Sequence, residues 1–128
     1  MMNKKTIGAA LLAAFLMSAM PGDNVITRDG KAVVVNTETI GKSIQGYAGA
    51  TPVKIYIEKN KITKVEALKN QEGPKYMAKA KKLLTEFEGK TVAKARKQKV
   101  DAVTGATFTS EALIKNVQKG LDYYEKNK

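Results

Sequence analysis

The sequence predicts an α+β fold, in which an antiparallel sheet built around a hairpin is covered by two main helices. Strand-like patterns occupy residues 31–68, whereas helical patterns occupy residues 73–90 and 109–124. This segregation along the chain is typical of α+β domains, because alternating strands and helices would instead favour a parallel sheet. The 128 residues suffice for one domain with a modest hydrophobic core.

The first residues have the layout of a secretory signal peptide. Lys4 and Lys5 precede an apolar run over 7–15, and small residues at 17–19 offer a cleavage window. The apolar run is shorter than the roughly 20 residues of a membrane-spanning helix. We therefore expect export to the periplasm or the extracytoplasmic face of the membrane, with a buried helix or an uncleaved anchor as alternatives. The expected organisation is a signal peptide at 1–19, an N-terminal segment with a strand at 20–40, and the main domain at 41–128.

β-branched residues mark the sheet. The run KAVVVNTETIG, at 31–41, favours a strand, and GYAGATP, at 46–52, is a Gly/Pro-rich turn. Val53, Ile55 and Ile57 then alternate with polar residues, and the dipeptide Lys59-Asn60 separates them from a second alternating run. Two such runs around a short turn with Asn predict a hairpin.

Two apolar stripes mark the helices. One recurs every three or four residues over 73–90, with Pro74 near its start and Gly89 just past its end. Residues 90–100 are expected to be a connection with one short element. A second stripe follows, for which Thr109 is the expected N-cap and Glu111 an acidic residue in the first turn.

Composition limits the chemistry that this chain can perform. It has no cysteine and no histidine, which removes disulfides, thiolate metal ligands and the commonest general base. We assign no catalytic residue and no metal site. Removal of residues 1–19, with Lys4 and Lys5, changes the net charge from +11 to +9, which favours anionic partners such as a membrane surface, acidic proteins or other polyanions. Export and the lack of aromatic residues within the lysine run at 94–99 argue against nucleic acid.

The segment DAVTGATFTS, at 101–110, is the candidate functional motif. Gly105 permits a sharp turn, and Ala106 leaves room for a close approach. Four hydroxyls gather around this pair at the start of a helix, where free amides favour an anion such as phosphate: Thr104, Thr107, Thr109 and Ser110. Asp101 would repel a phosphate unless a cation or donor bridged them. The residues alone leave two interpretations open, a capped turn and a phosphate site.

This segment resembles the flavinylation motif of the FMN-binding domain family, which reads Asp, two residues, Ser/Thr, Gly, Ala, Thr. The sequence contains it as Asp101-Ala102-Val103-Thr104-Gly105-Ala106-Thr107. The family includes the C subunit of the sodium-pumping NADH:quinone oxidoreductase, the G subunit of the Rnf complex and small exported flavoproteins. The resemblance implies that Thr107 carries covalent FMN through a phosphoester. It also implies a separate flavin transferase, which acts outside the cytoplasm with a metal ion and moves FMN from FAD onto the hydroxyl.

The resemblance extends from about Gly41 to Tyr124. It departs from the family pattern at 70–74, which reads NQEGP where members usually read Glu-Thr-Pro-Gly, and at two extra residues before Pro52. By resemblance, Asp101 is a recognition residue for the transferase. Tyr47 would stack on the flavin or pack within its turn, and Glu72 would contact the flavin or remain a solvated loop carboxylate.

The resemblance implies an exported electron-transfer flavoprotein that passes electrons between membrane or extracytoplasmic redox partners. A basic run such as 94–99 would then offer a docking surface for an acidic partner. One alternative is a secreted basic module without flavin that binds a membrane or polyanion. Another is a flavin domain that serves a reductase on a separate chain.

Overall fold

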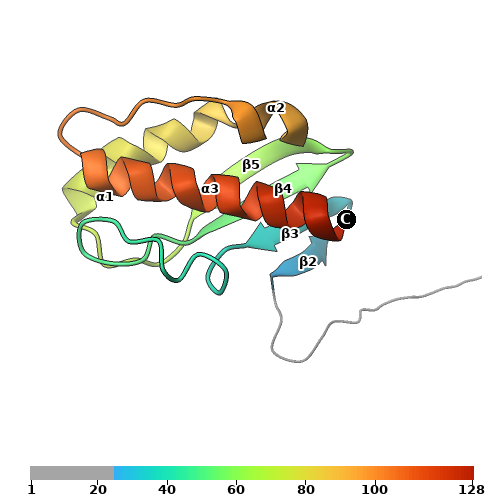
Figure 1. Cartoon of the computed structure of the whole chain (residues 1–128), viewed down its shortest axis with the longest axis horizontal. Helices are drawn as coiled ribbons and strands as arrows, with labels where there is room; N and C mark the ends of the chain where they lie inside the picture. The colour runs from blue at the N-terminus through green and yellow to red at the C-terminus, as the bar shows by residue number, and fades with distance from the viewer. Residues whose placement is uncertain (1–24) are drawn as a thin grey trace, which may run out of the picture.

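In the computed structural model, which describes residues 25–128, one antiparallel sheet is covered on one face by the helices (Figure 1). The predicted α+β class is confirmed. The expected signal peptide and its cleavage window lie outside the described residues. Within residues 25–128, no helix combines the length and apolar character that crossing a membrane requires.

The sheet has four strands in the order β2-β3-β4-β5, and each pairs with its neighbour in antiparallel fashion. The strands are β2 (Ile26–Asp29), β3 (Ala32–Asn36), β4 (Val53–Glu58) and β5 (Lys61–Ala67). The predicted hairpin is β4–β5, in which Lys59 and Asn60 both adopt positive φ angles of 51° and 62°. Positive φ at both central residues is what a two-residue type I′ hairpin turn requires. The hairpin prediction is therefore confirmed.

The region before the hairpin differs from the expectation. The expected strand over 31–41 ends at Asn36, because the Asn36 side chain accepts a hydrogen bond from the Glu38 amide (2.8 Å) and turns the chain. One strand was expected within 20–40, but β2 and β3 form a hairpin there across Gly30, whose φ is +61°. Short strands with exposed positions, as in β2, give a weak alternating pattern.

The helical layer consists of α1 (Pro74–Ala80), the 3₁₀ helix η1 (Lys81–Glu86), α2 (Val92–Lys97) and α3 (Thr107–Asn127). The single helix expected over 73–90 is thus divided, and its second half tightens into a 3₁₀ helix. Pro74 lies in the first turn and Gly89 follows the helix with φ +84°, as the sequence predicts. The short element expected within 90–100 is α2, and Thr91 caps it by accepting the Lys94 amide (3.2 Å).

The prediction that Thr109 caps α3 is wrong. Helix α3 begins at Thr107 with Ala106 as N-cap, and the Ser110 amide donates the first helical hydrogen bond to the Ala106 carbonyl (2.9 Å). The predicted turn at Gly105, with φ +87°, leads directly into the helix, so the N-cap lies three residues earlier than expected. Thr109 therefore lies inside the helix, and Glu111 lies beyond the first turn.

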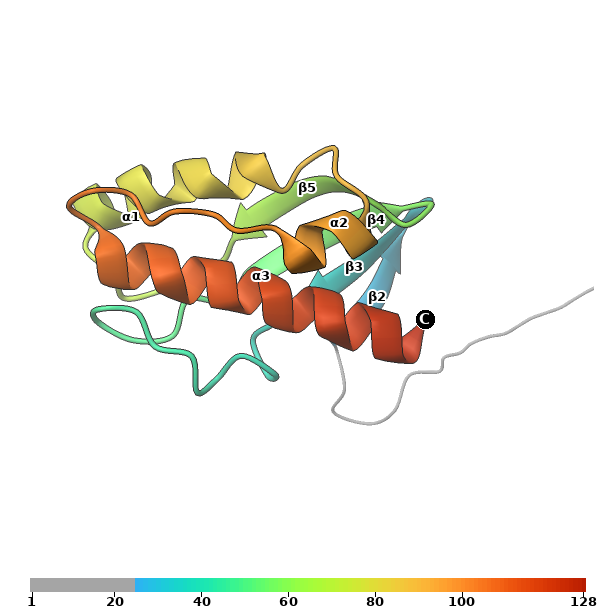
Figure 2. The same ribbon diagram turned by 45° about the horizontal axis from the view of Figure 1, so that its top comes forward.

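Helix α3 runs across the sheet and contacts both β3 and β4, as the two views show (Figures 1 and 2). Its buried stripe includes Leu113, Val117 and Leu121 and belongs to the same core cluster as Ile55. A Cβ at Gly120 would lie 2.7 Å from Ile55 Cδ1, so this glycine lets the helix approach the sheet closely. This packing fixes where the N-terminus of α3, and with it the motif, is held.

Candidate functional site

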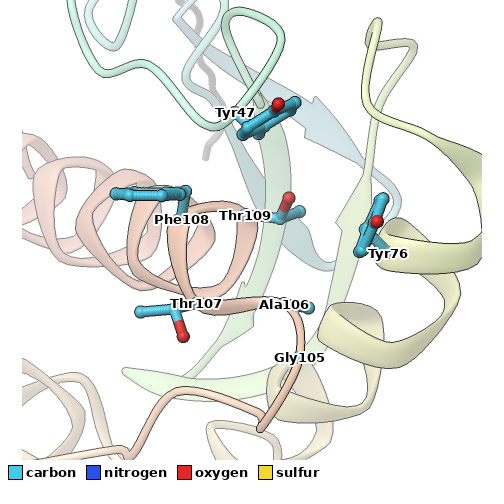
Figure 3. A pocket seen from close by; sticks show the side chains of 7 residues that line it. All are labelled: Tyr47, Tyr76, Gly105, Ala106, Thr107, Phe108 and Thr109. Atoms are coloured by element: carbon cyan, nitrogen blue, oxygen red, sulfur yellow. The ribbon is translucent and has the colours of Figure 1, made fainter.

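A pocket of about 300 Å³ lies at the N-terminus of α3, where three segments that are distant in sequence meet (Figure 3). Thr107 and Phe108 lie on the first turn of α3, Tyr47 projects from the loop after β3, and Tyr76 projects from α1. Residues Gly105, Ala106 and Thr109 complete its lining. The pocket therefore joins the predicted motif to two aromatic residues outside it.

Three exposed aromatic rings surround this pocket. The exposed fraction is 77% for Tyr47, 64% for Phe108 and 45% for Tyr76, and these are the large hydrophobic residues that stand exposed within 25–128. The ring centroids of Tyr47 and Phe108 are 6.3 Å apart with the planes tilted by 32°. Exposed aromatic rings can bury their faces against a flat conjugated ring, so a pocket surrounded by them is suited to a ligand of that kind. The alternative of Tyr47 as a packed turn residue is wrong.

Two hydrogen bonds among residues of the segment 101–110 stabilise the turn at Gly105. The Ala106 amide donates to the Val103 carbonyl (3.0 Å), and the Val103 amide donates to Ser110 Oγ (3.1 Å). Ser110 is fully buried and does not line the pocket. Its hydroxyl thus holds the turn around Gly105 rather than facing a ligand.

The four hydroxyls of the motif have different surroundings. Thr107 is exposed and lines the pocket. Thr109 is buried, and its hydroxyl donates a hydrogen bond of 2.5 Å to the Glu72 carboxylate. Thr104 is exposed but does not line the pocket, and Ser110 is engaged within the turn. Thr107 is therefore the motif hydroxyl that is both exposed and at the pocket.

Glu72 lies beneath the pocket rather than in it. The residue is only 6% exposed, so the alternative of a solvated loop carboxylate is wrong. Its two oxygens accept the amides of Tyr47 (2.9 Å) and Ala48 (2.6 Å) in addition to the Thr109 hydroxyl. A Cβ at Gly46 would lie 2.6 Å from the same carboxylate, so the loop can close on Glu72 only with glycine there.

The protonation of Glu72 follows from these contacts. Burial acts to raise the pKa of the carboxyl, but the hydrogen bonds from Thr109 and from the loop amides outweigh burial and lower the pKa below its ordinary value of 4.5. Glu72 is therefore ionised at neutral pH. As a carboxylate it can accept from all of these donors at once.

The residues around the pocket fit FMN. The amides of Thr107, Phe108 and Thr109 precede the first helical hydrogen bond, so the helix N-terminus presents donors suited to a phosphate. The exposed rings suit the isoalloxazine. Asp101 is exposed and, like Thr104, does not line the pocket, so neither is placed to contact a flavin within it.

Sequence reasoning missed Phe108 and Tyr76 as residues of this site. Phe108 could have been noticed, because it falls on the polar face of α3 with exposed Glu111 and Lys115. Tyr76 falls within the predicted stripe over 73–90, yet it is exposed. Lys79 does not line the pocket, but its Nζ would lie 3.3 Å from a Cβ at Gly105, a proximity that had no signal in the sequence.

Comparison with models of known protein families identifies the family of this chain. The family model described as FMN-binding domain matches residues 46–122, more than half of the chain. The matched range contains the Tyr47 loop, Glu72 and the whole motif. A search of curated proteins finds no match.

Proposed function

Since this chain belongs to the FMN-binding domain family, we propose that it is an exported electron-transfer flavoprotein with FMN esterified to Thr107. FMN, once bound, supplies one- and two-electron transfer. The protein would pass electrons between extracytoplasmic redox partners. The chain's own residues would hold and surround the cofactor.

The observation that carries this proposal is that Thr107 is exposed and lines the aromatic pocket. A transferase must bring its own active site to the acceptor hydroxyl, which only an exposed side chain allows. Thr109 and Ser110 are buried and hydrogen bonded, and a change of either would disturb the loop or the turn. The structure thus supports one acceptor among the four hydroxyls.

The attachment step forms one phosphorus–oxygen bond and breaks another. The Thr107 oxygen would attack the phosphorus on the FMN side of FAD, and the bond from that phosphorus to the bridging oxygen of the pyrophosphate would break. AMP would leave, and the hydroxyl proton would pass to a base of the flavin transferase, since Asp101, the carboxylate of the motif, does not line the pocket with Thr107. The product is a phosphodiester with one negative charge at the first turn of α3. A cofactor attached in this way is not lost by dilution outside the cytoplasm.

The roles of the other residues follow from their contacts. Tyr47, Phe108 and Tyr76 would flank the flavin ring at the pocket. Glu72 would position Tyr47 through the two loop amides without touching the flavin. Asp101, exposed and outside the pocket, would serve recognition by the transferase.

The test is intact-mass spectrometry of the protein after co-expression with a flavin transferase. We expect a gain of one FMN less one water, lost in Thr107→Ala and kept in Thr107→Ser. Thr63→Ala is the matched control, because Thr63 is an exposed threonine of β5 outside the motif, and it should keep the full gain.

A second candidate function is the secreted basic module without flavin, which the net charge of +11 favours. An unchanged mass in the wild-type protein, together with tight binding to anionic vesicles or heparin, would support this module and contradict the electron carrier. A flavinylated protein that supports turnover only with a separate reductase chain would identify the flavin domain of a reductase.

A further inference from the structure

We propose that Lys79 is the positioning residue that neutralises the phosphodiester formed at Thr107. This inference rests on the proposed function and adds to it the cationic partner of the cofactor. Lys79 lies in α1, which is separate in sequence from the motif.

The ammonium of Lys79 lies over the motif turn. A Cβ built at Gly105 would be 3.3 Å from Lys79 Nζ, so the space that a side chain would occupy there faces the ammonium. Helices α1 and α3 contact each other, and Tyr76 of α1 lines the same pocket as Thr107, so the segment that carries Lys79 lies near the N-terminus of α3. Gly105 therefore has two functions, since its positive φ makes the turn and its missing side chain leaves Lys79 its place.

Lys79 has no carboxylate partner within the described residues. The ion pairs found in 25–128 join Arg96 to Asp122 and Lys128 to Glu125, and neither includes Lys79. The lysine is nevertheless partly buried. A cation held close to the donor end of a helix, without an anion, is electrostatically unfavourable in the apo protein.

A phosphate ester on Thr107 would supply the negative charge that Lys79 and the N-terminus of α3 lack in the apo protein. It places one negative charge beside a lysine and beside the free amides of Thr107, Phe108 and Thr109, and charge-assisted hydrogen bonds of this kind are stronger than neutral ones. Flavinylation should therefore stabilise the protein, and Lys79 should account for part of the gain. The effect belongs to the holo protein, because the apo protein has no anion for Lys79 to pair with.

The experiment compares the melting temperature of each variant before and after flavinylation, with intact mass as a check on loading. The variants are Lys79→Gln, Lys79→Met, Lys79→Arg and Lys82→Gln. Lys82 is the matched control, because it is an exposed lysine of the neighbouring η1.

We expect flavinylation to raise the melting temperature of Lys79→Gln and Lys79→Met by about 4 °C less than it raises that of the wild type. A shift of this size corresponds to the loss of one weak charged contact in a domain of this length. Lys79→Arg should keep most of the gain, and Lys82→Gln should keep all of it. High salt should reduce the gain in the wild type more than in Lys79→Gln. A folded Lys79→Gln that fails to be flavinylated, while Lys79→Arg succeeds, would also support the proposal.

An undiminished gain in Lys79→Gln would overturn the role of Lys79 while leaving FMN attachment intact. A large loss of apo stability in both Lys79→Gln and Lys79→Met would overturn it too, since Lys79 would then be a structural residue. If the wild-type protein gains no mass, the proposed function itself fails, and this inference fails with it.

Discussion

The Thr109 hydroxyl donates a 2.5 Å hydrogen bond to Glu72, a residue 37 positions earlier in the chain. The same carboxylate accepts the amides of Tyr47 and Ala48. One buried anion thus ties the first turn of α3 to the loop that carries an aromatic wall of the pocket. The pocket depends on a residue that does not line it.

Replacement of Glu72 by Gln should lower the free energy of unfolding and flatten its dependence on pH. Because the folded pKa of Glu72 lies below the ordinary 4.5, the carboxylate stabilises the fold above that pH, and this contribution is lost as the pH falls through the folded pKa. We expect a loss of about 2 kcal/mol at neutral pH, because an amide cannot accept from all three donors. Urea unfolding between about pH 3 and pH 7 measures both effects.

Glu111→Gln is the control for this series, because Glu111 is an exposed carboxylate of the same helix. It should leave stability within about 0.5 kcal/mol of the wild type. An acid-side slope in Glu72→Gln as steep as that of the wild type would show that other carboxylates carry the pH dependence.

Loss of an aromatic wall should release the flavin ring from the pocket. In flavinylated Tyr47→Leu, we expect flavin fluorescence to rise roughly twofold or more, because a phenol ring in contact with the flavin quenches its emission by electron transfer and such an aromatic contact is worth about 0.5–1.5 kcal/mol. The attached mass should not change, since the ester is formed at Thr107. Steady-state fluorescence at matched flavin absorbance is the measurement.

Tyr56→Leu is the matched control for Tyr47→Leu. Tyr56 lies opposite Val34 and Lys64 in the sheet register, whereas its neighbours Ile55 and Ile57 belong to the buried core. Its ring therefore points to the face of the sheet away from the helices. Equal fluorescence changes in Tyr56→Leu and Tyr47→Leu would argue against a flavin held at the pocket.

Ser110→Ala should reduce stability without preventing flavinylation. The Val103 amide would lose the Ser110 hydroxyl as its acceptor, which costs about 1 kcal/mol for a partly buried hydrogen bond. The Thr107 hydroxyl would still be exposed at the pocket. Thermal unfolding and intact mass, measured on the same preparation, separate this structural role from cofactor binding. Absence of FMN from a folded Ser110→Ala protein would assign Ser110 to the cofactor instead.

Patterns that depend on neighbouring residues could be predicted from the sequence. The β4–β5 hairpin, the class of the fold, the placement of Pro74 and Gly89 and the motif at 101–107 all follow from periodicity, turn chemistry or a contiguous match. The errors lie where a contact from elsewhere decides the local structure. Thr109 has the chemistry of an N-cap, but the turn at Gly105 starts α3 earlier and Glu72 takes its hydroxyl.

A hydroxyl motif compatible with phosphate, placed just before an amphipathic helix, can be identified from the sequence alone, because such a motif is local and its residues are contiguous. Long-range packing sets which threonine is exposed at the pocket, which aromatic rings surround that pocket and which lysine lies near Gly105. Tyr47, Tyr76 and Lys79 meet the motif because α1 and the loop after β3 pack at the end of α3. The packing of the buried stripe of α3 on the sheet holds that end in place, and no local pattern encodes it.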